Sequence, residues 1–422
     1  MTQVANSGRP AAKGWWARYN GLPLYLRILL GLVLGVLVGL LLGPAAKPLD
    51  WPARIILRLL GALAPVLILV AVVRAIMTAN IHGRLALRLV GLLLLNTLTA
   101  IVIGLGVANL LEPGVGAALA PPQRAVQVHG DVLTQLLENI PESLLRPFVD
   151  NRVIGVVLIA VAFGVAARRL PKKQHDLAET LCEMGFSLIL EMLHWVIALV
   201  PLAVFGKVAS IVGVSGFRPF LALGWFVVAV LLALLLQSTF YLVRIRLGSW
   251  VRPWSLLANT RDALVMAFST ASSTATMPVT YARLRERVGL RDQSASLGAL
   301  VGSNFNNDGT ALYEAMAALF VAQLLGVELS LTEQLLVVLT SVVASIGAAG
   351  IPEAGLVTMT LVFSAVNLPT EYIALLLTVD WFLDRCRTTI NVLGDMNVAC
   401  LIEGKTRQGP APADSPSSEP LK

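Results

Sequence analysis

Residues 267–278 read AFSTASSTATMP, and residues 344–355 read ASIGAAGIPEAG. Each stretch interrupts an apolar segment, 256–282 and 331–367 respectively, with small residues and a proline. Backbone that leaves a helix at membrane depth must line a cavity or be buried in protein, because an unsatisfied amide in lipid is costly. We therefore expect two re-entrant helical hairpins. The alternative is that the small residues merely allow close helix packing.

The composition around these stretches is that of an integral membrane protein. Of 422 residues, 56% are hydrophobic and 14% are charged, which is far from a soluble profile. A bilayer core of about 30 Å takes roughly 20 apolar residues per helix. The first apolar run lacks a small-residue cleavage site, so it is expected to remain as a helix. We expect eight spans, near residues 24–44, 52–78, 85–111, 151–167, 183–208, 218–243, 294–325 and 371–403.

Basic residues mark one side of the predicted membrane. The net charge of +7 comes from Lys and Arg at the ends of apolar runs, not from one stripe with interleaved aromatics, so no nucleic acid partner is expected. The basic loops precede span one, link spans two and three, and follow spans four and six, where Arg244 and Arg246 lie. The positive-inside rule makes this face cytoplasmic, with both termini inside.

The first span carries a glycine every fourth residue. Gly31, Gly35, Gly39 and Gly43 form a smooth ridge along one helix face. Such a ridge lets a neighbouring helix approach closely, so we expect it to pack against another span.

Each predicted hairpin is followed by a long helix, and the two units enter from opposite faces in this topology. Paired broken segments in corresponding positions indicate an inverted repeat and a transporter binding site near the midplane.

The last span carries its polar residues on one face. Asp380, Asp384, Arg387, Asn391 and Asp395 are spaced by 4, 3, 4 and 4 residues, which places them within an arc of roughly 80°. Each ionisable group at this depth costs about 2.5–3.5 kcal/mol even on a lenient scale, which favours a functional role over a structural ion-pair ladder.

The seventh span repeats this signature in NFNNDGTALYEA, residues 304–315. Asn306 and Asp308 cluster beside a glycine, and an unwound turn there would expose carbonyl oxygens suited to a hard monovalent cation. Glu314 lies further along the same apolar stretch. A lone buried glutamate is a candidate proton carrier.

Two other functional classes fit less well. A channel would use rings of like charge or carbonyls, whereas here both signs meet on one helix, as a zwitterion's site requires. An enzyme would need a nucleophile, a base and an orienter, and Ser269, Ser272 and Ser273 have no histidine close to them in sequence. No catalytic residues or cofactor are therefore expected.

The motifs together resemble the dicarboxylate/amino acid:cation symporters, which include the excitatory amino acid transporters and their archaeal homologues. STASSTATMPVT, NDGTALYEA, SIGAAGIPEAGLVTM and DWFLDRCRTTINVLGD carry the resemblance. It implies the all-α glutamate-transporter-homologue fold: eight transmembrane helices, two re-entrant hairpins and inverted repeats, in a homotrimer in the cell membrane. The implied organisation is a cytoplasmic segment 1–23, a mainly scaffold part 24–250 from which span 85–111 joins the transport unit, a transport core 251–403, and a disordered tail 404–422.

The resemblance also implies acidic amino acid symport by elevator-type alternating access. Asp384 would take the substrate's α-amino group, Asn391 and the Ser272–Ser273 tip its α-carboxylate, and Arg387 its side-chain carboxylate, since Arg offers a planar fork. A dicarboxylate without an amino group would not need Asp384. A C4-dicarboxylate or neutral amino acid symporter and, more distantly, an anion channel remain alternatives. The implied substrate ligands are Ser272, Ser273, Thr310, Gly350, Asp384, Arg387, Thr388 and Asn391.

Cation sites follow from the same resemblance, with sodium and protons as coupling ions and Glu314 as the proton carrier. The first site would use Asp395 with carbonyls of Gly302, Asn306 and Asn391. The second would use Asp308 with Asn306 and the Asn96–Thr97 pair. The third would use backbone carbonyls of Asn304, Ser345, Ile346 and Ala348.

Several residues depart from the family pattern around these cation sites. Asn307 stands where most members have methionine, Asn96 replaces a hydroxyl residue, and Leu93 stands where some members have tyrosine. Glu353 adds a carboxylate to the second hairpin tip. We therefore hypothesise an altered stoichiometry, or protons in place of some sodium.

Overall fold

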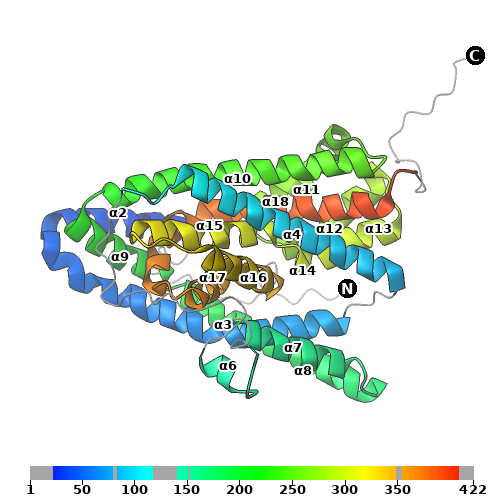
Figure 1. Ribbon diagram of the computed structural model, residues 1–422, viewed down its shortest axis with the longest axis horizontal. Coiled ribbons are helices and arrows are strands. Elements are labelled where there is room, and N and C mark those ends of the chain that lie inside the picture. Colours follow the sequence, from blue (N-terminus) through cyan, green and yellow to red (C-terminus); the bar gives the residue numbers. More distant parts are fainter. Residues whose placement is uncertain (1–21, 79–82, 117–139, 151–152, 348–353, 408–422) are drawn as a thin grey trace, which may run out of the picture.

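The computed structural model describes residues 22–78, 83–116, 140–150, 153–347 and 354–407, and every regular element within these ranges is helical (Figure 1). The first half contains α2 (Leu24–Leu42), the 3₁₀ helix η1 (Gly43–Asp50), α3 (Trp51–Thr78), α4 (Gly83–Leu111), α6 (Arg146–Val149), α7 (Val153–Ala167), α8 (Lys172–Ile197), α9 (Val200–Ser215) and α10 (Arg218–Gly248). The second half contains α11 (Pro253–Thr270), α12 (Ser273–Arg283), the π-helix η2 (Leu284–Val288), α13 (Asp292–Ser296), the π-helix η3 (Leu297–Val301), α14 (Gly302–Phe305), α15 (Asp308–Leu324), α16 (Leu331–Gly347), α17 (Ala354–Ala365), the 3₁₀ helix η4 (Thr370–Tyr372) and α18 (Ile373–Glu403).

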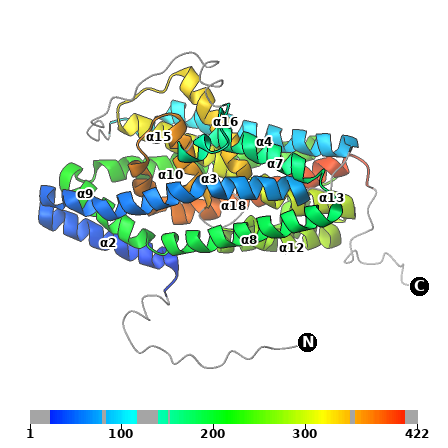
Figure 2. The same ribbon diagram turned by 90° about the horizontal axis from the view of Figure 1, so that it is seen from below.

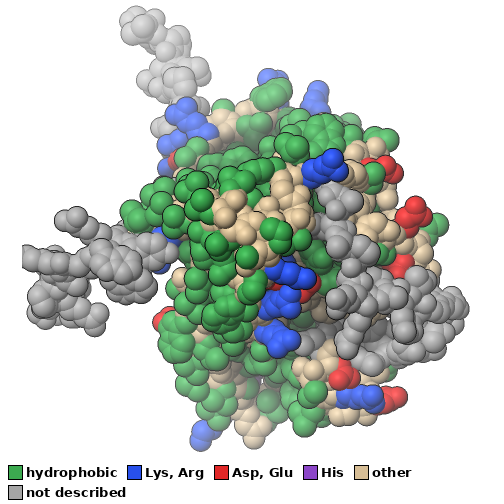
Figure 3. Space-filling model, turned by 90° about the vertical axis from the view of Figure 1, so that its left-hand side faces the viewer, with side chains coloured by type: hydrophobic (Ala, Val, Ile, Leu, Met, Phe, Trp, Pro, Cys, Tyr) green, Lys and Arg blue, Asp and Glu red, His purple; other side chains and the backbone are tan. Residues whose placement is uncertain are grey.

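The described surface is strongly apolar. Within the part of the chain that the structure describes, four helical stretches are long and apolar enough to cross a membrane: Leu26–Arg74, Leu87–Leu111, Lys172–Ile197 and Arg218–Gly248. Large hydrophobic side chains are exposed along several of these helices, and Figure 3 shows hydrophobic side chains over much of one end of the molecule. Contiguous apolar surface of this extent indicates contact with lipid or with another protein.

The glycine ridge of α2 packs against α9, as the sequence predicts. A Cβ atom at Gly31 would lie 2.5 Å from the backbone oxygen of Pro201, and one at Gly35 would lie 2.7 Å from that of Phe205. Any side chain here would push the two helices apart. Gly43 differs, because it lies beyond the end of α2 with a φ of 53°, and nothing lies within 4 Å of its Cβ position.

The fifth predicted span, 183–208, is wrong as a single helix. The structure instead has α8 ending at Ile197 and α9 beginning at Val200. Pro201 explains the break, because proline has no backbone N–H and its ring clashes with the carbonyl four residues earlier, that of Ile197. α8 also begins much earlier than predicted and packs beside α3 (Figure 2).

The core of the molecule is built on α15 and α18. Nearly all residues of α15 and most residues of α18 are buried. α18 packs against α10, α11 and α15, and α4 covers α15 from another side. Eight of the predicted site residues lie on these two helices, so much of the predicted site lies inside the protein.

The region of the first predicted hairpin forms two helices packed against each other, α11 and α12. α11 ends where Ala271 adopts a left-handed conformation with a φ of 51°. Ser272 then caps α12, because its hydroxyl accepts a hydrogen bond from the backbone N–H of Ala275 at 3.1 Å. α16 and α17 also pack against each other. Their connection, which holds Gly350 and Glu353, lies outside the described residues.

The seventh predicted span, 294–325, is interrupted rather than continuous. α14 ends at Phe305, the Asn306–Asn307 pair leaves the helical conformation, and α15 begins at Asp308. The break falls where asparagine and glycine predict an unwound turn.

Candidate functional site

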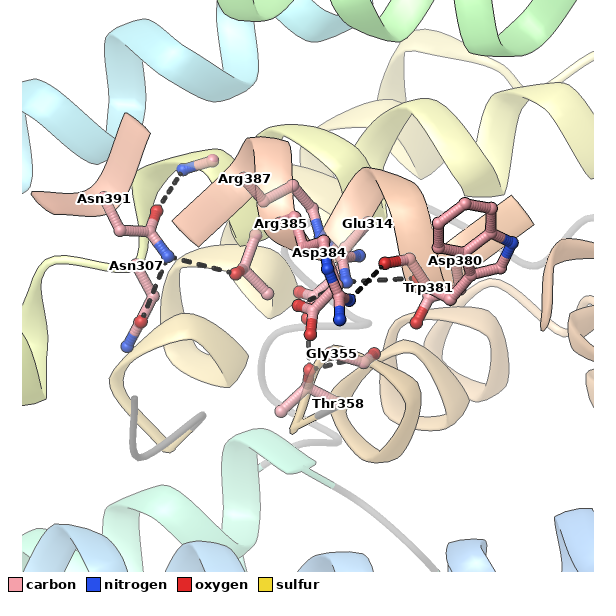
Figure 4. Close-up of polar contacts among 12 residues, drawn as sticks. Asn307, Glu314, Gly355, Thr358, Asp380, Trp381, Asp384, Arg385, Arg387 and Asn391 are labelled. Carbon is pink, nitrogen blue, oxygen red and sulfur yellow. Dashed lines mark hydrogen bonds and ion pairs between the residues drawn. The ribbon is translucent and has the colours of Figure 1, made fainter. Parts of the chain in front are cut away.

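Arg387 lies at the centre of the polar face of α18, and its side chain is fully buried. Its Nη2 atom lies 2.8 Å from Asp384 Oδ1 and 3.1 Å from Asp380 Oδ1 (Figure 4). The guanidinium also stacks over the Tyr313 ring of α15, 4.1 Å from its centroid. Helical spacing produces this arrangement, because residues three and seven apart share one face.

The other nitrogen atoms of the Arg387 guanidinium have no protein acceptor among the described residues. Its Nε and Nη1 atoms are buried without a hydrogen-bond partner. Gly355 of α17 approaches this side, since a Cβ atom there would lie 3.2 Å from Nη1. Unpaired buried donors of this kind are expensive, and a bidentate carboxylate would satisfy them.

Glu314 lies on α15, and it is fully buried near Arg387. The hydroxyl of Thr358 on α17 donates a hydrogen bond to Glu314 Oε1. Glu314 Oε2 has no partner among the described residues. The carboxyl group therefore has one oxygen free to hold or exchange a proton.

Asn391 joins α18 to the start of α15. Its Oδ1 atom accepts a hydrogen bond from the backbone N–H of Gly309 at 2.8 Å. Its Nδ2 atom lies 3.4 Å from both Asn307 Oδ1 and Thr310 Oγ1 (Figure 4). Two predicted substrate residues, Thr310 and Asn391, are thus in direct contact.

The tip of the first hairpin contacts the broken seventh span. Ser273 donates a hydrogen bond to the backbone oxygen of Ser303 at 3.0 Å. Ser272 serves as the cap of α12, and Thr388 is buried on α18. Gly350, the remaining predicted substrate residue, lies outside the described residues.

The first predicted cation site has unpaired oxygen atoms. Asp395 is buried, and neither its Oδ1 atom nor Asn306 Oδ1 has a hydrogen-bond partner among the described residues. Asn306 Nδ2 holds the turn in place through the backbone oxygen of Asn391 at 2.9 Å. Gly302 lies so close that a Cβ atom would meet Asp395 Oδ1 at 2.5 Å. Buried oxygen atoms without donors fit a hard cation.

In the second predicted cation site, the carboxylate oxygens of Asp308 accept hydrogen bonds from protein groups. Thr97 donates to Asp308 Oδ1 at 2.6 Å, and the Tyr241 hydroxyl donates to Asp308 Oδ2. Arg244 donates to Asn96 Oδ1. The expectation that Arg244 lies in a loop after span six is wrong, because α10 continues to Gly248 and carries this side chain toward Asn96.

The third predicted cation site is described only in part. The backbone oxygen of Ser345 accepts a hydrogen bond from Asn307 Nδ2 at 2.9 Å. Asn304 bonds to the Leu300 oxygen at 3.1 Å, and Ile346 lies near the end of α16. Ala348 lies outside the described residues.

Several residues that the structure places at the site have no predicted role there from the sequence. Tyr241 and Arg244 come from α10, Thr358 and Gly355 from α17, and Tyr313 from α15. Tyr241 and Arg244 are three residues apart, which is a helix-face spacing and therefore a usable signal. Nothing in the sequence tells which buried side chain each one meets.

Comparison with known proteins agrees with the helical architecture and the polar α15–α18 core. The profile of the sodium:dicarboxylate symporter family matches residues 24–405. The chain belongs to this family. Its relatives include excitatory amino acid transporter 1 of Ambystoma tigrinum, which is 35% identical over 295 residues, or 65% of this chain and 54% of the relative.

Two further relatives are similar. Human excitatory amino acid transporter 2 is 36% identical over 293 residues, 66% of this chain and 50% of the relative. An excitatory amino acid transporter of Caenorhabditis elegans is 38% identical over 248 residues, 58% of this chain and 49% of the relative. The chain spans about half the length of these relatives. Family membership and the apolar helices make it a multi-pass membrane protein.

Proposed function

We propose that this protein is a secondary symporter of acidic amino acids, L-glutamate or L-aspartate, driven by sodium or protons. One observation carries the proposal: the fully buried Arg387 guanidinium keeps Nε and Nη1 without acceptors among the described residues, beside two carboxylates. A buried guanidinium with unpaired N–H donors can bind a carboxylate, and neighbouring aspartates can bind an ammonium group. An acidic amino acid carries both groups.

The charged groups of the substrate bind to different protein residues. The side-chain carboxylate meets Arg387, and the α-amino group meets Asp384. The α-carboxylate meets Asn391 and the tip at Ser272 and Ser273, with Thr310, Thr388 and Gly350 completing the pocket. Asp384 favours an amino acid over succinate or malate, because a plain dicarboxylate has no ammonium for it.

Sodium is the coupling ion that the family's name implies, and the Asp395 site fits it. Asp395, Asn306, Gly302 and the Asn391 carbonyl would hold the ion, and its binding would bring α14 and α18 together. Glu314, with one oxygen bonded to Thr358 and the other without a partner among the described residues, is the group for a coupled proton. A cation held beside the pocket makes substrate affinity depend on the ion gradient.

The membrane arrangement is part of the same proposal. α11–α12 and α16–α17 are the two re-entrant hairpins, and the second one closes over substrate and ion. Span three (85–111) and residues 251–403 form the transport unit. The rest of 24–250 forms a scaffold that trimerises in the lipid of the cell membrane, with both termini cytoplasmic.

Binding of a panel of acids tests the substrate assignment. L-aspartate, L-glutamate, succinate and L-serine are titrated calorimetrically into the purified protein in sodium buffer, for the wild type, Arg387→Cys and Arg387→Lys. We expect aspartate and glutamate to bind the wild type more tightly than succinate. Removing one partner of a buried charge pair costs about 2–5 kcal/mol, so Arg387→Cys weakens both by roughly 30-fold or more.

The two variants separate charge from geometry. Arg387→Lys keeps the charge and loses the fork, so its affinity for aspartate falls between the other two. L-serine binding gained by Arg387→Cys would support the assignment further. Equal aspartate affinity in the wild type and Arg387→Cys would overturn it.

A further inference from the structure

Arg244 is a positive charge carried by α10 into the second predicted cation site. Its guanidinium lies over the Phe240 ring, 5.2 Å from the centroid, and donates to Asn96 Oδ1. Asn96 is fully buried on α4 and directly precedes Thr97, which bonds to Asp308. The guanidinium is therefore anchored at the edge of the Asp308 pocket and not in the surrounding solvent.

Both oxygen atoms of Asn96 already accept a hydrogen bond from a side chain of α10. Its side-chain oxygen accepts from Arg244, and its backbone oxygen accepts from Gln237 Nε2 at 3.2 Å. Its Nδ2 atom faces Asn397 Oδ1 at 3.5 Å. The amide is thus oriented by three neighbours, and turning its oxygen toward a free cation would break the bond to Arg244.

Asp308 is likewise satisfied by protein groups. Each of its carboxylate oxygens accepts a hydroxyl hydrogen, one from Thr97 and one from Tyr241. Tyr241 lies one helical turn before Arg244, so one face of α10 supplies both a hydroxyl and a positive charge to this pocket. A guanidinium stays charged under all ordinary conditions, which gives Asp308 a permanent counter-charge.

We propose that the Arg244 guanidinium is a tethered cation that takes the place of a free ion at the Asn96–Thr97–Asp308 site. The residues there do not fit a sodium ion while Arg244 is bound to Asn96. The chain therefore binds one cation fewer than the three sites of the resemblance imply. This inference concerns the ion coupling of the proposed symporter, but its test needs no substrate.

Thermal unfolding against sodium concentration tests the inference. The purified protein is melted at a series of NaCl concentrations, with choline chloride keeping the ionic strength constant. An ion that binds only the folded state stabilises it with the logarithm of its concentration, so the slope counts bound ions. We expect stabilisation to rise more steeply with the logarithm of the sodium concentration in Arg244→Gln than in the wild type. The difference in slope corresponds to about one additional bound ion. The double variant Arg244→Gln/Asp308→Asn returns to the wild-type slope.

Two controls accompany this comparison. Arg246→Gln removes the same charge from an exposed position two residues away and keeps the wild-type slope. Arg244→Lys keeps a positive charge in place and also keeps the wild-type slope, even if Arg244→Gln folds poorly.

Three results would overturn the inference. The first is an equal slope in the wild type and a folded Arg244→Gln. The second is a shallower slope for Asp308→Asn alone, which would place an ion at Asp308 beside Arg244. The third is a steeper slope for Arg244→Lys. Failure to bind any acidic amino acid would refute the proposed function and leave these slopes unaffected.

Discussion

Asp395 and Asp308 are both deeply buried carboxylates near the Asn306–Asn307 break, yet their surroundings differ. Asp395 Oδ1 has no hydrogen-bond donor among the described residues, and Asn306 Oδ1 beside it has none either. Asp308 has a hydroxyl donor on each oxygen and an arginine anchored to the adjoining asparagine. Burial alone therefore does not distinguish the two carboxylates, whereas the hydrogen-bond donors around them do.

The two sites also differ in what lies beside the carboxylate. Gly302 has no side chain beside Asp395, and a Cβ atom there would lie 2.5 Å from Oδ1. At Asp308 the neighbouring space is taken by the Tyr241 ring and by Asn96 with its arginine. We call the Asp395 site open, because Asp395 Oδ1 has no donor among the described residues, and the Asp308 site closed, because each carboxylate oxygen there accepts a hydroxyl hydrogen.

Asp395→Asn is the change with the largest expected effect. It removes the charge from the open site, and breaking a buried ion pair costs about 3–5 kcal/mol. The sodium concentration needed for half-maximal stabilisation therefore rises by roughly 100-fold or more. Thermal unfolding against NaCl at constant ionic strength measures this.

Asp308→Asn is the matched comparison. It removes the same charge from the closed site, and the sodium dependence of unfolding stays that of the wild type. If the two substitutions weaken the sodium response equally, the distinction between the sites is lost.

Gly302→Ala sharpens the comparison at the open site with a smaller effect. The added methyl group must displace Asp395 Oδ1, and overpacking of this kind costs typically about 1–3 kcal/mol. Half-maximal sodium stabilisation shifts upward by roughly 10-fold. Gly106→Ala on α4 is the control, because nothing lies within 4 Å of its Cβ position. An unchanged sodium response in Gly302→Ala would remove Gly302 from the site.

Tyr241→Phe has the smallest effect and concerns the closed site alone. It removes one donor from Asp308, and an unsatisfied buried acceptor costs about 1–3 kcal/mol. The unfolding temperature falls, and the slope against sodium stays constant because Arg244 remains in place. Tyr281→Phe removes a hydroxyl that meets Asp292 at an exposed position, so its melting temperature stays near that of the wild type. A steeper sodium slope in Tyr241→Phe would show that the hydroxyl, and not Arg244, excludes the ion.

Some of this architecture was predictable from sequence because local rules determine it. The glycines of α2 recur at helix spacing, and the structure confirms that they face a close neighbour. The break at Asn306–Asn307 and the single polar face of α18 follow from residue types and periodicity.

Other features depend on contacts between distant segments. The kink between α8 and α9 follows from Pro201, but the apolar run 183–208 hides it from a search for continuous spans. Arg244 follows an apolar run, so the positive-inside rule assigns it to a loop, and only the packing of α10 against α4 reveals its contact with Asn96. Pairing across helices cannot be derived from spacing along one of them.

Uptake of radiolabelled L-aspartate into proteoliposomes tests the central claim most directly. Inward sodium and inward proton gradients are imposed separately on vesicles containing the wild type or Arg387→Cys. We expect the wild type to accumulate L-aspartate, driven by one gradient or by both. Vesicles with Arg387→Cys should accumulate no more L-aspartate than empty vesicles. No accumulation of aspartate or glutamate under either gradient, or equal accumulation in both proteins, would contradict it.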